Sequence, residues 1–501
     1  MPPRLPEPEP TRRIPEPDTR RLFLTVLPSI MLPMFLAVMD QTIVATALPA
    51  IAGELGGAER VSWIVVAYLV ATTIAAPVYG RLGDSFGRRR LMFVAIVIFV
   101  AASLFCAVAA SIEALAASRV LQGLGGGGLM TLSQALIGET IPARERGRFQ
   151  GYLAAVVVSS SAFGPVAGGF LTEHFGWRSI FLVSAPLGAL AFLLALRLPR
   201  RAGIGHPGRF DGIGLLCLVA FVAPLLLALE QLQRLDPAGV PRAAALAVLS
   251  IVSLLLLIRR EKKAALPLLP ISLLRQPSVW RSDALAACHG AALVSLTTFI
   301  PIYLRVVRGA SPAESGLLLL PLTIGIGTGS VIIGRLVSRT GYTAIFPSCG
   351  LFVATLAIIF IAFRAPYLDM VELALALGFT ALFMGSVMGV VQITIQHAAG
   401  RDNLGAAAAS VQLSRSIGAA FGAAIVGAVL FAAFFAEGGD APKLFGLLME
   451  NGPAALVPLP PAARANIEAV VANGFRAAFL TMAGFAASGM ILAWTIPSRR
   501  I

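Results

Sequence analysis

Residues 80–111 read GRLGDSFGRRRLMFVAIVIFVAASLFCAVAAS, a short basic loop followed by an unbroken apolar run. The run at 91–111 is long enough to cross a bilayer, because a transmembrane helix needs about 20 apolar residues. Similar runs recur from residue 22 to residue 496, without the two-residue alternation of a transmembrane barrel. Because a helix satisfies its own backbone hydrogen bonds in lipid, the pattern predicts an all-α integral membrane protein.

The composition of the chain excludes most soluble classes. Of its 501 residues, 57% are apolar and only 13% are charged. An average soluble domain has about 25% charged residues, and a disordered chain is poor in apolar ones. The net charge of +14 would suggest nucleic acid in a soluble protein, but in a membrane protein it must first be assigned to one side of the membrane.

The apolar runs predict fourteen spans in a 6 + 2 + 6 arrangement. A polar tail at 1–21, expected to be disordered, precedes an N-terminal six-helix bundle at 22–198. A linker at 199–283 contains two extra helices, and a second six-helix bundle follows at 284–501. The predicted spans are 22–46, 61–80, 91–111, 115–138, 149–171, 179–198, 212–230, 243–258, 284–304, 315–337, 343–363, 371–396, 405–433 and 475–496.

The distribution of Lys and Arg predicts the topology. If the N-terminus is cytoplasmic, the loops and tails on that side hold 27 of the 39 Lys and Arg residues and the opposite loops hold ten. Cytoplasmic loops are the ones enriched in Lys and Arg. The excess positive charge therefore indicates cytoplasmic N- and C-termini in a cytoplasmic (inner) membrane, and no nucleic-acid partner is expected.

The loop at 80–90 has a spacing that a purely basic loop does not explain. Gly80 and Gly87 permit a tight turn and close helix approach. Asp84 can accept hydrogen bonds from a neighbouring helix N-terminus, while Arg88 can pair with a carboxylate and Arg89 adds cytoplasmic charge. We expect this loop to act in conformational gating. Gly334 to Gly341 echoes it after the second span of the last six, which suggests an internal repeat.

Charged residues inside the spans are few. We place Asp40 near the end of the first span, Arg119 in the fourth and Arg415 in the thirteenth. A charge within a membrane defaults to a functional role and faces a partner or a cavity. Asp40 and Arg119 are therefore candidates for electrostatic coupling, although a structural ion pair or an interfacial position is the simpler alternative.

The fifth span contains a glycine-proline segment, SSSAFGPVAGG at 159–169. Pro165 frees a backbone carbonyl and kinks a helix. Gly164, Gly168 and Gly169 allow a neighbouring helix to approach closely. We expect these residues to contribute to a moving helix interface.

Together these segments resemble the major facilitator superfamily, and within it the fourteen-helix drug–proton antiporters. DQTIVATALP at 40–49 is similar to the first-helix signature of that branch. The 80–90 loop, Arg119 with Gln122 and Gly123, and Gly164-Pro165 with Gly168 and Gly169 are similar to the loop, fourth-helix and fifth-helix motifs. The sixth-helix match at Trp177-Arg178 is partial, because Ser179 and Ser184 replace the Trp and Asn usual in the family.

The resemblance implies a major facilitator fold and proton-coupled multidrug efflux by alternating access, as in antibiotic resistance. Protons and small hydrophobic or cationic compounds would be the partners, together with the lipid bilayer. Asp40 and Arg119 would couple proton entry to export. An exporter of one metabolite or siderophore is the main alternative, while an intramembrane enzyme, a channel and a scaffold are less consistent with the motifs. The need for a periplasmic adaptor stays open.

Other features bear on energy source and substrate. The sequence has no Gly-x-x-x-x-Gly-Lys-[Ser/Thr] loop, so we expect no ATP-binding site and no cofactor, with the proton gradient as energy source. No metal-binding or nucleophile-elbow motif is present, so we expect no metal and no enzyme activity. Candidates for substrate contact are Gln122, Arg415, Gln392 and His289, although a lone His in a helix is more often structural.

Overall fold

The computed structural model describes residues 19–56, 60–199, 211–233, 239–264, 266–436, 447–449, 452–458, 460–498 and 500. This part of the chain is helical and contains no strand, only an isolated bridge between Tyr342 and Arg500. The predicted tail at 1–21 lies outside the described residues up to residue 18. The first helix begins at Thr19, so the last three residues of that tail are helical.

The first seven helices follow the order of the predicted first bundle. They are α1 (Thr19–Leu55), α2 (Ser62–Phe86), α3 (Arg88–Ala107), α4 (Ile112–Thr140), α5 (Arg146–Phe175), α6 (Ser179–Leu182) and α7 (Ser184–Ala195). Gly87, with φ 94°, is the single residue between α2 and α3. Only glycine adopts this backbone conformation readily, so it allows the two long helices to join in the tightest possible turn.

The remaining helices form the linker and the second half. The linker contains α8 (Gly212–Gln233), α9 (Val240–Glu261) and α10 (Ile271–Leu274). The second half contains α11 (Pro277–Arg308), α12 (Pro312–Thr340), α13 (Ile345–Arg364), α14 (Met370–Met384), α15 (Ser386–Ala399), α16 (Leu404–Ala436) and α18 (Pro461–Thr495). Two 3₁₀ turns, η3 (Arg401–Asn403) and η4 (Gly452–Leu456), complete the described elements.

Each predicted span falls on one of these helices or, in two places, on a helix pair. The pairs are α6–α7 and α14–α15, each interrupted at one residue. Within the described chain, 12 helical segments are long and apolar enough to cross a membrane. The two predicted spans outside this set are α4, which contains Gly125 to Gly128, and the broken pair α6–α7.

Two separate hydrophobic cores underlie the two halves. Buried side chains between Val26 and Leu198 form the core of the first half, with Leu36, Phe99 and Leu129 fully inaccessible. Buried side chains between Leu273 and Ile496 form the core of the second half. The first-half core and the second-half cores are therefore separate clusters of buried side chains.

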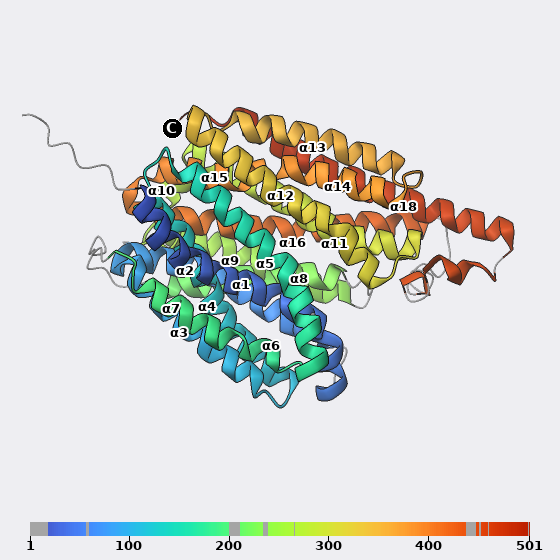
Figure 1. Ribbon diagram of the computed structural model, residues 1–501, viewed down its shortest axis with the longest axis horizontal. Coiled ribbons are helices and arrows are strands. Elements are labelled where there is room, and N and C mark those ends of the chain that lie inside the picture. The colour runs from blue at the N-terminus through green and yellow to red at the C-terminus, as the bar shows by residue number, and fades with distance from the viewer. Residues whose placement is uncertain are drawn as a thin grey trace, which may run out of the picture.

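The linker helices lie against both halves. Leu218 and Val222 of α8 pack with Ile74 of α2 and Leu413 of α16 in one buried cluster. Ser62 at the start of α2 also donates a hydrogen bond to Glu230 of α8. In Figure 1, α8 and α9 lie behind α1 and α5, on the side of the molecule away from the viewer. The inserted pair therefore covers the junction of α2 with α16.

The opposite junction joins α5 to α12. The two helices lie side by side at the left of Figure 1 and diverge toward the right. Their closest approach is at Gly147 of α5 and Gly334 of α12, where an added Cβ at Gly147 would lie 2.6 Å from the carbonyl oxygen of Gly334. The two halves thus meet at the α2–α16 and α5–α12 junctions, and α4 also contacts α15 and α16 between them.

Candidate functional site

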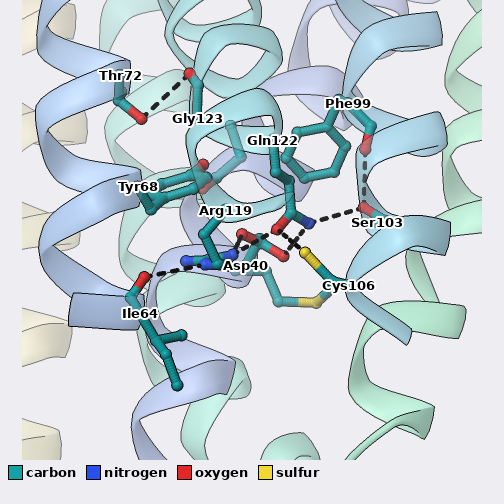
Figure 2. Close-up of polar contacts among 12 residues, drawn as sticks. Asp40, Ile64, Tyr68, Thr72, Phe99, Ser103, Cys106, Arg119, Gln122 and Gly123 are labelled. Carbon is teal, nitrogen blue, oxygen red and sulfur yellow. Dashed lines mark hydrogen bonds and ion pairs between the residues drawn. The ribbon is translucent and has the colours of Figure 1, made fainter. Parts of the chain in front are cut away.

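The centre of the first half contains a buried ion pair between α1 and α4. Nη1 of Arg119 lies 2.5 Å from Oδ2 of Asp40, and the side chains are 1% and 0% exposed. Figure 2 shows the two side chains pointing toward each other between the helices. Because removing a charge from water is costly, such a pair requires further hydrogen bonds around it.

Gln122 supplies those hydrogen bonds. One turn after Arg119 on α4, its Nε2 donates to Oδ1 of Asp40 and to Oγ of Ser103 on α3, both at 2.7 Å. Its Oε1 accepts from Arg119 at 2.6 Å (Figure 2). Both carboxylate oxygens of Asp40 are therefore bonded, and the cluster links α1, α3 and α4. The spacing of Arg119 and Gln122 explains the motif, since residues three apart share a helix face.

An aromatic ring and a backbone carbonyl complete the surroundings of the guanidinium. The Arg119 carbon Cζ lies 4.2 Å from the centre of the Tyr68 ring, which gives a cation–π contact. Nε of Arg119 donates to the carbonyl of Ile64 on α2 at 3.3 Å. Tyr68 is held in place because its hydroxyl donates to the carbonyl of Ala37 at 2.9 Å. The pair is thus enclosed by α1, α2, α3 and α4.

The glycines of α4 allow this close packing. A Cβ at Gly125 would lie 2.7 Å from the backbone of Phe99 on α3, and one at Gly123 would lie 2.6 Å from the carbonyl of Tyr68 on α2. Larger residues there would separate α4 from its neighbours. The glycine run therefore holds Arg119 and Gln122 close to their partners on the other helices.

A second polar centre joins the two halves. Asp84, near the end of α2, accepts hydrogen bonds from the backbone amides of Gly405 at 2.9 Å and Ala406 at 3.1 Å. These amides lie in the first turn of α16, where the helix dipole favours a carboxylate. Arg88 forms ion pairs with Asp84 and with Glu139 of α4, the latter at 2.7 Å.

The backbones at this junction are in direct contact. A Cβ at Gly80 would lie 2.5 Å from the carbonyl oxygen of Gly405 and 3.0 Å from Cβ of Ala409. Neither glycine accepts a side chain unless α2 and α16 separate. Asp84 and Gly80, four residues apart, thus fix α2 to α16 by a hydrogen-bonded cap and a close backbone contact.

The α5–α12 junction repeats this arrangement with one change. Gly334 on α12 packs on Gly147 of α5, and Oγ of Ser338 accepts a hydrogen bond from the backbone amide of Arg148 at 2.9 Å. Ser338 follows Gly334 by four residues, as Asp84 follows Gly80. The sequence echo is therefore also a structural one, in which a serine replaces the aspartate.

The fifth-helix glycines pack against the first helix. A Cβ at Gly168 would lie 2.5 Å from the carbonyl oxygen of Ile43, and one at Gly164 would lie even closer to Oγ1 of Thr42. Pro165 lies between them within α5, which is continuous from Arg146 to Phe175. At Gly169, no atom would lie within 4 Å of an added Cβ. The first-helix and fifth-helix motifs, far apart in sequence, are thus one interface.

Comparison with known proteins decides the family. Residues 30–423 match the model of the Major Facilitator Superfamily. The chain belongs to the major facilitator superfamily. Multidrug transporter protein MdtP of Bacillus subtilis is 32% identical over 418 residues, which is 82% of this chain and 75% of that protein. Uncharacterized MFS-type transporter Rv1877 of Mycobacterium tuberculosis is 33% identical over 470 residues, or 92% of this chain and 67% of that protein.

Solved structures support the same fold at low sequence identity. The proton:xylose symporter XylE superposes with a TM-score of 0.63 at 13% identity, covering 96% of this chain and 97% of that one. The human organic anion transporter MFSD10 superposes with a TM-score of 0.61 at 15% identity, covering 95% and 100%. From its family match and its relatives, this major facilitator protein is a multi-pass membrane transporter of small molecules, and the predicted family and non-enzymatic class are confirmed.

The remaining predicted residues of this major facilitator protein lie apart from the Asp40 cluster. Arg89 donates to the carbonyl of Leu196 at 2.8 Å. His289 is buried on α11, and its Nε2 lies 3.1 Å from the carbonyl of Met384. Arg415 on α16 donates to Oε1 of Gln412 at 3.0 Å. Gln392 is buried on α15 with its Nε2 unpartnered.

Gln122 differs in position from the other predicted substrate contacts, because its side chain is fully buried inside the Asp40 cluster. Its amide is bonded to Asp40, Arg119 and Ser103. Within the described ranges, no group of three or more His, Cys, Asp or Glu side chains is placed to hold a metal ion.

Sequence reasoning missed several residues of these sites. The predicted linker at 199–283 includes Asp283, whereas this residue lies in the second turn of α11 and is 8% exposed. The signal was present, because Pro277 is typical of the first position of a helix and places the start of α11 there. No sequence signal identified Ser103 and Tyr68 as partners of the Asp40 cluster, or Ser338 as a partner of Arg148.

Proposed function

We propose that this transporter exports hydrophobic compounds across the cytoplasmic membrane in exchange for protons, by alternating access of its two halves. The observation that carries the proposal is the buried cluster of Asp40, Arg119 and Gln122. A membrane-embedded carboxylate and arginine are rare and mark ion pathways. Here they lie inside one half, where a proton can act on helix packing without meeting the substrate.

Protonation of Asp40 would change the packing of α1. A neutral carboxyl group no longer balances the charge of Arg119, so their 2.5 Å contact weakens. Two and three residues further along α1, Thr42 and Ile43 pack on Gly164 and Gly168 of α5. The other end of α5 forms the junction with α12. This series of contacts offers a physical route from the proton site to the interface between halves.

The gating part of the proposal rests on Asp84. The conformer described here is closed where α2 meets α16 and where α5 meets α12. By the predicted topology these ends face the cytoplasm, so this conformer would be closed to the inside. Export then requires both junctions to open so that a compound can enter from the cytoplasm or the inner leaflet.

We also propose fourteen membrane spans with cytoplasmic termini. In this arrangement α4 and α6–α7 cross the membrane in addition to the 12 segments that qualify by length and composition. The 29 residues of α4 extend about 44 Å, more than the hydrocarbon core, and α4 packs against α2 and α3. The asymmetry of 27 against ten basic residues supports the same orientation.

Drug efflux is favoured over a single metabolite by the named relatives. MdtP is a multidrug transporter, and Multidrug resistance protein 3 of Bacillus subtilis is 29% identical over 317 residues, or 63% of this chain and 62% of that protein. The test is efflux from proteoliposomes across a panel of dyes and antibiotics, with and without a proton gradient. We expect gradient-dependent export of several unrelated compounds. Export of one compound alone would favour the metabolite exporter, and full proton-coupled efflux by Asp40→Asn would exclude the coupling role.

A further inference from the structure

Asp283 is a buried carboxylate on a spanning helix that the proposed mechanism does not yet use. It lies on α11, six residues after Pro277, and its side chain is 8% exposed. Neither Oδ1 nor Oδ2 has a hydrogen-bond partner, and no ion pair involves this residue within the described chain. A buried carboxylate without partners is costly, and such a group usually marks a site whose partner is absent.

The surroundings of Asp283 are apolar with one hydroxyl group. Ser410 of α16 is the hydroxyl group close enough to interact with the carboxylate, and in this conformer it donates to the carbonyl of Ala407 at 3.0 Å. Val279 and Ala286 of α11 and Val411 of α16 are buried nearby in the same helix packing. A carboxylate among aliphatic side chains is the arrangement that a cation with an apolar body requires, since binding pockets combine apolar lining with few oriented polar groups.

Asp40 is not available for the same task. Both of its oxygens accept hydrogen bonds, and Arg119 neutralises its charge. A cationic compound would have to displace Arg119 in order to bind there. Asp283 lacks any such competitor in its immediate contacts, so the two carboxylates differ in what they can bind.

The position of Asp283 also provides a route of access. Ser410 follows Gly405 by five residues, which is about 7.5 Å along the axis of α16. Gly405 is the residue whose amide Asp84 caps. When α2 separates from α16, the first turns of α16 are the part that loses its cover, and Ser410 with Asp283 lies directly beyond them.

We propose that Asp283 binds the positively charged group of the exported compound, so that the preferred substrates are lipophilic monocations. This inference rests on the proposed export function. A single positive charge is favoured because Arg415 lies five residues beyond Ser410 on α16, about 7.5 Å along the axis. Arg415 packs on Gly290 of α11 and donates only to Gln412 among the described partners. A second positive charge on the substrate would be repelled by this guanidinium.

The test measures binding of tetraphenylphosphonium, a permanent lipophilic cation, to the purified full-length protein by isothermal titration calorimetry. We expect Asp283→Asn to weaken binding at least tenfold and to reduce efflux of tetraphenylphosphonium from proteoliposomes, while efflux of the neutral dye Nile red continues. Glu468→Gln removes an exposed carboxylate on α18 and is the matched control, with wild-type binding expected.

A second measurement leaves Asp283 unchanged and covers a folding failure of Asp283→Asn. Tetraphenylphosphonium should slow maleimide labelling of Ser410→Cys in a background without the native cysteines, whereas the anion tetraphenylborate, of the same shape, should not. Unchanged affinity in Asp283→Asn, or equal effects of the two ions on labelling, would overturn the proposal. Loss of both cation and neutral-dye efflux with intact cation binding would also overturn it, because Asp283 would then be a proton site.

The outcomes separate this inference from the export function. If wild-type protein binds tetraphenylphosphonium through Asp283 but no compound is exported with a proton gradient, the export function fails and the binding site stands. If gradient-driven efflux is present and Asp283→Asn has no effect on binding, the binding site fails and the export function stands.

Discussion

Asp84 of α2 accepts a hydrogen bond from the backbone amide of Gly405 on α16, a residue 321 positions later in the chain. The equivalent contact at the opposite junction runs from the amide of Arg148 to the hydroxyl of Ser338. One junction is therefore capped by a carboxylate and the other by a neutral hydroxyl group. Since hydrogen bonds that involve a charged group are the stronger ones, the two junctions differ in the free energy needed to open them.

Asp84→Asn should favour opening of the α2–α16 junction. The amide side chain loses the ion pair with Arg88 and the charge that suits the N-terminus of α16. A hydrogen bond to a charged group contributes about 1.5–3 kcal/mol, so the open population should rise roughly tenfold or more. The measurement is the labelling rate of Ser410→Cys, which is 3% exposed before substitution, together with a fall in transport turnover. Unchanged labelling and turnover would contradict a latch at Asp84.

Ser338→Asp should have the opposite effect at the α5–α12 junction. The new carboxylate can accept the hydrogen bond from the Arg148 amide and adds a charge at the start of α5. We expect a stabilisation of the closed conformer by about 1 kcal/mol and a lower turnover. Ser338→Ala removes the acceptor and serves as the matched control. Double electron–electron resonance between labels on α5 and α12 measures the populations, and an identical distribution in both variants would refute the prediction.

Gly405→Ala should keep the α2–α16 junction from closing. The added methyl group would overlap the carbonyl oxygen of Gly80 and lie 2.7 Å from Oδ1 of Asp84. Overpacking of this kind costs about 1–3 kcal/mol, here only in the closed conformer. Gly169→Ala is the control, because no atom lies within 4 Å of its added Cβ. Labelling of Ser410→Cys should be faster in the Gly405→Ala background than in the Gly169→Ala background. Equal labelling rates would argue against a close contact at Gly405.

The Asp40–Arg119 pair should behave as a unit in a double-mutant cycle. Removing one member of a buried ion pair costs about 3–5 kcal/mol, because the other charge remains without compensation. Asp40→Asn and Arg119→Gln should each lower the thermal unfolding midpoint, and the double variant should lose less than the sum of the two. Additive losses would mean that the two side chains do not interact in the folded protein.

Helix positions were the most predictable part of the fold. Long apolar runs must become helices in lipid, so each predicted span falls on a helix or a helix pair, although α1 and α18 extend well beyond the predicted spans 22–46 and 475–496. Local interruptions were less visible, because Val183 and Gly385 end one helix and begin the next without a sequence feature that requires it. Which helices pack together also depends on distant surfaces. The contact of α8 with both α2 and α16 has no signature in either sequence segment.

The candidate site was predictable at positions where the free-energy cost of burying a charge in the membrane makes charged residues rare. Asp40 and Arg119 were identified because charges in spans are rare, and the structure places them in contact. Asp283 was not predicted as a buried residue, because it follows a polar segment that is typical of a loop. Pro277 nevertheless indicated the start of the helix. The backbone amides that bind Asp84 carry no side-chain chemistry, so only the fold could identify them.

The inserted helix pair gives the transporter two unlike flanks. On one flank α8 packs against both α2 and α16, so the two halves can move there only by sliding over α8. On α5 and α12, Val166, Phe170 and Ile324 are 71%, 56% and 62% exposed. If these side chains contact lipid acyl chains, the halves move against lipid on this flank and against α8 on the other. The free energy needed for the movement then differs between the two flanks. Membrane thickness and fluidity would then influence export through the α5–α12 flank. The resistance from α8 on the α2–α16 flank would not depend on the lipid.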